Sequence, residues 1–232
     1  MITFQEPTKI TPLYELAKGR GAAFVEMDGW QVPGSFGDTE AETAVCTHFV
    51  GLADASHGGK ITVEGKDASA MIQSVWHVGE LAIGQGIAIS ETIWLFRLRQ
   101  DRFFVNTAGG AKTAVLDTLN QAAANADSLI SVGNSTHGNA QLMLIGPNSA
   151  QLLSRLCGLD FHDSEFPAWT AKQSSVGKTA QLILRHDAGD VPTYSIIGAA
   201  SFGAYLWDVI LEAGANLGVK EVGLTAVLQM MA

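Results

Sequence analysis

The chain has 232 residues, of which 47% are hydrophobic and only 16% charged, which excludes a disordered or collagen-like protein. Its 14 basic and 23 acidic residues give a net charge of −9, and this acidity argues against nucleic acid as the main partner. The longest uncharged apolar stretch, residues 191–207, is broken by Pro192 and Gly198, so we predict no membrane span.

The two cysteines, Cys46 and Cys157, are too few and too far apart for a disulfide framework or a four-ligand zinc site. We predict that both are buried thiols in a reducing compartment. Residues 1–7 have neither a basic start nor an apolar run, so we expect no signal peptide and a cytoplasmic location. The spacing of the six histidines predicts no metal site.

The first elements are two helices. Thr11 followed by Pro12 predicts a helix that ends at Gly19, and Thr39-x-x-Glu42 matches a capping box that opens a second helix. Alternation at residues 61–63 predicts a strand, which turns at 65–67 into a helix with Asp67 as its N-cap. The sequence then predicts a hairpin of two strands, residues 94–99 and 102–105, and a helix from residue 112 to 123.

The strand, glycine turn and helix near residue 61 are repeated 81 residues later. Leu142, Leu144 and the turn Gly146-Pro147-Asn148 precede Leu152, Leu153 and Leu156, with Asn148 in the N-cap position. Because such units are common, coincidence is the alternative to an internal duplication. Towards the end of the chain, Ser201 is expected to cap a long amphipathic helix, and residues 222–232 also have a helical pattern.

These patterns predict an α+β fold of two similar half-domains, with antiparallel sheets and packed helices. We place the half-domains at about residues 40–130 and 131–222, within one domain of residues 1–232. The cleft between the half-domains is the expected ligand site.

Several motifs contain residue types that could carry chemistry. Gly177-Lys178-Thr179 lacks the first glycine of a phosphate loop, and Asp54-x-Ser56-His57 lacks a nucleophile elbow. His57 is either a hydrogen-bonded turn residue or a ligand contact. Arg97 and Arg99 belong either to a solvated strand face or to a fork for a ligand carboxylate.

Four separate motifs resemble the glycine cleavage T-protein (aminomethyltransferase) family. The motifs lie at residues 11–16, 29–33, 51–60 and 63–68, and the segments 205–214 and 223–226 resemble later parts of the same family. The stretch from Gly146 to Trp207 also resembles the gamma subunit of heterotetrameric sarcosine oxidases. This resemblance implies tetrahydrofolate as cofactor and transfer of one-carbon units in a central cleft.

The sequence also departs from the family pattern. Glu91 and Thr92 stand where the family has paired aspartates, Val227 replaces an arginine, and we expect the family's C-terminal barrel to be absent. If the resemblance extends to the site, Glu91 is the catalytic carboxylate, which holds the folate or accepts a proton from its amine, and the folate contacts are Asp54, His57, Arg97 and Tyr194.

Two functions remain open at this point, and whether the chain is an enzyme is left undecided. In the first, the chain binds tetrahydrofolate and assists one-carbon transfer. In the second, it is a non-catalytic subunit, similar to the sarcosine oxidase gamma chain, that docks on a larger flavin or folate enzyme. A homo-oligomer is a further possibility for its assembly.

Overall fold

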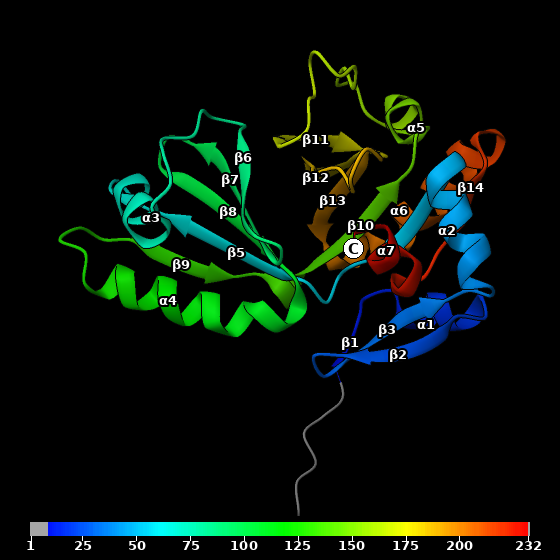
Figure 1. The fold of residues 1–232 in the computed structure, drawn as a ribbon, viewed down its shortest axis with the longest axis horizontal. Helices are drawn as coiled ribbons and strands as arrows, with labels where there is room; N and C mark the ends of the chain where they lie inside the picture. The colour runs from blue at the N-terminus through cyan, green and yellow to red at the C-terminus, as the bar shows by residue number, and fades with distance from the viewer. Residues whose placement is uncertain (1–8, 232) are drawn as a thin grey trace, which may run out of the picture.

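The computed structural model describes residues 9–231 and consists of a small N-terminal sheet and two larger lobes (Figure 1). The small sheet has the strand order β1-β3-β2, from β1 (Lys9–Ile10), β2 (Ala23–Met27) and β3 (Trp30–Ser35), with α1 (Tyr14–Gly19) after β1. Asp28 and Gly29 join β2 to β3 with φ of 52° and 78°, as a two-residue hairpin turn requires. The segment on which the expectation of no signal peptide rests lies outside the described residues.

The first lobe is built on a five-stranded antiparallel sheet with the order β6-β7-β8-β5-β9. The predicted hairpin and helices are confirmed here. In chain order the elements are β5 (Gly59–Glu64), α3 (Ala68–Trp76), β6 (Gly86–Ser90), β7 (Ile93–Arg99), β8 (Arg102–Thr107), η1 (Gly109–Ala111), α4 (Lys112–Ala124) and β9 (Ser131–Asn134).

The second lobe repeats this arrangement. After η2 (Thr136–Gly138) come β10 (Asn139–Ile145), α5 (Ser149–Leu156), β11 (Thr170–Val176), β12 (Thr179–Arg185), β13 (Thr193–Ala199), η3 (Ala200–Phe202), α6 (Gly203–Gly214), η4 (Ala215–Leu217) and β14 (Val219–Glu221). Its strand order, β11-β12-β13-β10-β4-β14, matches the first sheet except that β4 (Val50–Asp54) is inserted beside β10. Gly65 and Gly146 occupy equivalent turns, with φ of 159° and 139°. The α+β fold with two similar halves is therefore confirmed.

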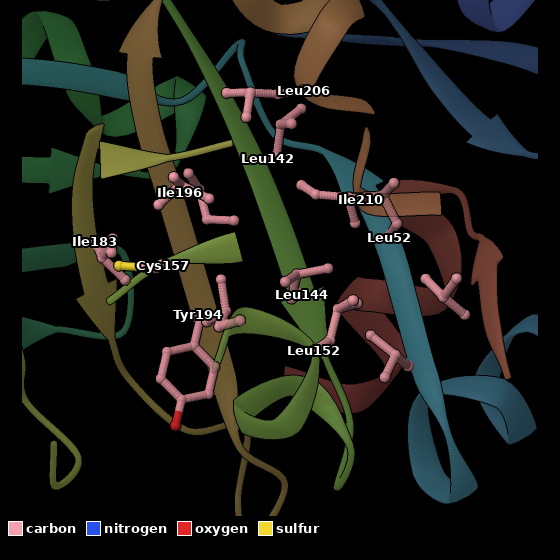
Figure 2. Close-up of a cluster of buried hydrophobic side chains, with 14 of the residues drawn as sticks. Leu52, Leu142, Leu144, Leu152, Cys157, Ile183, Tyr194, Ile196, Leu206 and Ile210 are labelled. Atoms are coloured by element: carbon pink, nitrogen blue, oxygen red, sulfur yellow. The ribbon is translucent and has the colours of Figure 1, made fainter. Parts of the chain in front are cut away.

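Each lobe has its own core. In the second lobe, the helices α5 and α6 cover one face of the sheet and bury leucines and isoleucines around Tyr194 (Figure 2). Trp207 of α6 is part of the same core. A further cluster joins the lobes, where Phe96 and Phe104 of the first sheet lie with Leu184 of the second. The space between the lobes, which the sequence predicted to be an open cleft, is thus partly filled by packed side chains.

Two of the predicted helix caps, Thr39 and Ser201, are wrong. Asp38 caps α2 (Thr39–His48) through the N–H of Glu40, whereas Glu42 accepts hydrogen bonds from the backbone N–H groups of Phe36 (2.6 Å) and Gly223 (2.7 Å). A buried carboxylate needs donors, and these distant amides supply them.

Asp67 and Asn148 stand in the predicted N-cap positions of α3 and α5, but neither makes a side-chain cap hydrogen bond. The amide of Asn148 instead donates to the carbonyl oxygen of Leu217. Ser201 lies within η3, before α6 begins. The final helix is α7 (Leu224–Met231).

The predicted burial of Cys46 and Cys157 is confirmed. Among residues 9–231, none of the helices has the length and apolar character needed to cross a membrane.

Candidate functional site

A cavity of about 80 Å³ lies where the two lobes and α7 meet. The segment after β4 contributes His57, the first sheet contributes Trp94 and Asn106, and the second contributes Gln141. The remaining wall is largely apolar, and the last helix supplies much of it: Leu224, Val227, Leu228 and Met231.

The polar wall of the cavity is a pair of amides. Asn106 Nδ2 donates to Gln141 Oε1 and Gln141 Nε2 donates to Asn106 Oδ1, both at 3.1 Å. The second hydrogens of the two amides go to Gly59 O (2.9 Å) and Ser195 Oγ (3.1 Å). Because all four N–H bonds of the pair are used inside the protein, these side chains hold the lobes together and have no donor left for a ligand.

Two histidines face the same cavity. His186 stacks on Trp94 with ring centroids 5.0 Å apart and planes 9° from parallel. Burial lowers the pKa of His186 to about 4, and burial together with the charge of Lys60 lowers the pKa of His57 to about 4. Both rings are therefore neutral at pH 7, and within the described part of the chain His57 Nδ1 has no hydrogen-bond partner.

Behind His57 lies a buried ionisable pair. Lys60 is 0% exposed, and its Nζ donates to the carbonyl oxygens of Ser56 (3.0 Å) and Gly58 (2.7 Å). Burial lowers the pKa of Lys60 to about 7, while the nearby Asp54 opposes the shift. Burial raises the pKa of Asp54, whose Oδ1 accepts a hydrogen bond from the N–H of Ser56 (2.9 Å). Neither side chain is part of the cavity wall.

The structure does not bring the five predicted site residues together. His57 lines the cavity, whereas Asp54 is buried behind it and Glu91 is exposed in the turn between β6 and β7. Tyr194 lies in the core of the second lobe (Figure 2). Whether any of them contacts folate stays a prediction.

Arg97 is buried within the first lobe and does not form a fork with Arg99. It donates to the carbonyl oxygens of Leu81 (2.7 Å) and Gln100 (3.1 Å), so its donors hold the segment around β7. The neighbouring Arg99 instead pairs with Glu64 at 2.6 Å.

The sequence reasoning missed Trp94, Asn106, Gln141 and His186 as parts of one site. A signal was present for the two amides, because each is a polar residue within an otherwise buried strand. The pairing of these residues across 35 positions could not be seen in a local pattern.

Comparison with known proteins gives the family. The family described as GCVT N-terminal domain matches residues 13–231, and the chain belongs to it. Aminomethyltransferases from Halothermothrix orenii and Symbiobacterium thermophilum are 27% and 29% identical over 94% and 95% of this chain. The chain covers 63% and 62% of their lengths, which is less than two thirds.

A second group of similar proteins consists of sarcosine oxidase chains. The sarcosine oxidase subunit alpha of Rhizobium meliloti is 26% identical over 94% of this chain, which covers 24% of that protein. Among solved structures, the glycine cleavage aminomethyltransferase T of Bartonella henselae has a TM-score of 0.82 at 24% identity. The match covers 97% of this chain and 62% of the Bartonella chain. A chain of the heterotetrameric sarcosine oxidase from Corynebacterium sp. U-96 has a TM-score of 0.68 at 21% identity. The match covers 91% of this chain and 97% of the oxidase chain.

The junction cavity does not fit tetrahydrofolate. Pockets for ligands of this size hold about 300–1,000 Å³, whereas the cavity holds about 80 Å³. None of its lining residues, all within residues 9–231, is a carboxylate that could accept from the N–H groups of a pterin.

Proposed function

We propose that this chain is a non-catalytic subunit that docks on a larger enzyme of the flavin- or folate-dependent demethylating type. The observation that carries the proposal is the small junction cavity, which α7 narrows and in which the paired amides have no free donor. A chain whose central site is closed in this way has no room to bind a large cofactor, so it is better suited to a structural role in a complex. The reduced, buried cysteines favour the cytoplasm as its compartment.

Two further observations support this proposal. The chain matches nearly the full length, 97%, of one chain in a heterotetrameric sarcosine oxidase. It also exposes large apolar side chains that a partner would cover, among them Leu129 (91% exposed) and Ile83 (65% exposed).

The test is purification of the tagged chain from its native host, followed by native mass spectrometry. We expect one complex of fixed stoichiometry with a larger companion chain, and we expect the tagged companion to recover this chain in return. Recovery of the chain alone, or as a self-oligomer, would contradict the proposal.

Tetrahydrofolate binding with one-carbon transfer is the second candidate. It is supported by the family and by the stacked rings of Trp94 and His186 in the cavity wall, since flat aromatic surfaces suit a pterin. In this candidate Glu91 acts as the proton acceptor. The candidate predicts that the purified chain consumes tetrahydrofolate in a one-carbon transfer assay, that Glu91→Ala abolishes the activity, and that the exposed control Asp117→Ala retains it. If the wild-type chain shows no activity in this assay, the second candidate is contradicted and the subunit proposal remains.

A further inference from the structure

A second hollow, larger than the junction cavity, lies between the two lobes. This groove holds about 410 Å³, against about 80 Å³ for the cavity, and the two share no lining residue. Its volume is within the range of small-molecule pockets. Strands of both sheets line it, β5, β7 and β8 from the first lobe and β11, β12 and β13 from the second.

The groove has an apolar wall formed by both lobes. Phe104 of β8 meets Leu182 of β12 and Ile197 of β13, and all three side chains are buried in the cluster that joins the lobes. Because they are already packed against one another, they present a preformed apolar surface to the groove.

Arg102 of β8 supplies a cation at this surface. Its Nε is buried and has no hydrogen-bond partner among the described residues, and its ion-pair contact is Glu64 Oε2 at 3.6 Å. Glu64 is engaged more closely by Arg99, at 2.6 Å. The guanidinium of Arg102 is therefore only weakly neutralised and remains able to pair with an anion.

Gln181 of β12 supplies an acceptor. The residue is 4% exposed, and its Nε2 donates to Thr179 Oγ1 at 3.0 Å. Its Oε1 accepts no hydrogen bond in the part of the chain that the structure describes, which is costly for a buried amide. Gly198 on the neighbouring strand makes room for this amide, because a Cβ at that position would overlap it.

We propose that the groove binds a small organic carboxylate that has an apolar body and one N–H or O–H donor. The carboxylate pairs with Arg102, the donor reaches Gln181 Oε1, and the apolar body lies on Phe104 and Ile197. Arg102 Nε and Gln181 Oε1 have no hydrogen-bond partner among the described residues. The proposal does not depend on the proposed function, because it concerns a separate hollow.

The test uses indole-3-acetate as the probe in isothermal titration calorimetry, since this compound combines a carboxylate, a flat apolar ring and one N–H. We expect saturable binding of one molecule per chain. Naphthalene-1-acetate, which lacks the N–H, should bind about tenfold more weakly, and tryptamine, which lacks the carboxylate, should not bind.

Three variants locate the binding. Arg102→Gln should weaken indole-3-acetate binding by about tenfold or more, and Gly198→Val should do the same by crowding the amide. Lys66→Gln is the control, because Lys66 is an exposed cation that does not line the groove. Thermal unfolding verifies that each variant is folded, and Arg102→Lys is the second variant at that position. No saturable heat from the wild type, or an affinity that Arg102→Gln leaves unchanged, would overturn the proposal.

Discussion

Asn106 of β8 and Gln141 of β10 form a reciprocal amide pair, with both hydrogen bonds at 3.1 Å, that connects the first lobe to the second. Both side chains are buried. At the junction cavity, the pair is a fixed contact inside the protein and leaves no free amide N–H for a ligand there.

The first prediction concerns this pair. Asn106→Leu removes both hydrogen bonds between the paired amides and the amide donor to the carbonyl of Gly59, so we expect the free energy of unfolding in urea to fall by about 2–4 kcal/mol. The exposed Asn120→Leu is the control and should change it by less than about 0.5 kcal/mol. In the double variant with Gln141→Leu, the loss should be smaller than the sum of the single losses. Additive losses would show that the pair is not coupled.

The second prediction concerns the pH dependence that Lys60 produces. Its pKa is about 7 in the folded chain and 10.5 as the ordinary value, so between these pH values the unfolded state binds more protons. The free energy of unfolding should therefore rise from pH 7 to pH 10, with a slope from this residue approaching about 1.4 kcal/mol per pH unit. Lys60→Met should remove that part of the slope. An identical slope in the variant would rule out Lys60 as its source.

The two cavity histidines give a third prediction, in the acid range. Because burial lowers the pKa of His57 and of His186 from 6.5 to about 4, the folded chain resists their protonation. Their contribution to stability is complete above pH 6.5 and is lost as the pH falls towards 4. NMR titration of the imidazole resonances should give midpoints near pH 4 for both rings, and midpoints above 6 would mean that the cavity is open to water.

A fourth prediction tests the turn that recurs in both lobes. Gly146 has a φ of 139°, and a Cβ there would overlap the carbonyl of Phe49. Gly146→Ala should lower the free energy of unfolding by about 2 kcal/mol or more. Gly138→Ala is the matched control, because a Cβ at Gly138 meets nothing within 4 Å. Equal stability of the two variants would contradict this account of the turn.

Much of the fold could be predicted because its signals are local. The hairpin of residues 94–105 and the repeat at a spacing of 81 residues follow from alternation, turn glycines and helical periods. The insertion of β4 beside β10 could not be predicted, since it pairs Asp54 with Leu142 across the whole first lobe. The pairing of strands that are far apart in the chain cannot be predicted from a short window of sequence.

The site was harder to predict than the fold. Alternation assigns Arg97 to one face of a strand, but it does not show that nearby backbone carbonyls take up its donors. In the same way, the position of Glu91 just before a predicted strand does not say whether the carboxylate faces a cavity or the solvent. The structure shows it exposed.

The most direct test of the central claim is calorimetric titration of the purified chain with tetrahydrofolate. The junction cavity between the lobes is too small for this cofactor, so we predict no saturable heat up to about 1 mM ligand, a level at which even weak binding is detected. Saturable binding of one molecule per chain, lost in Trp94→Leu, would contradict the account and would show that the junction is a folate site.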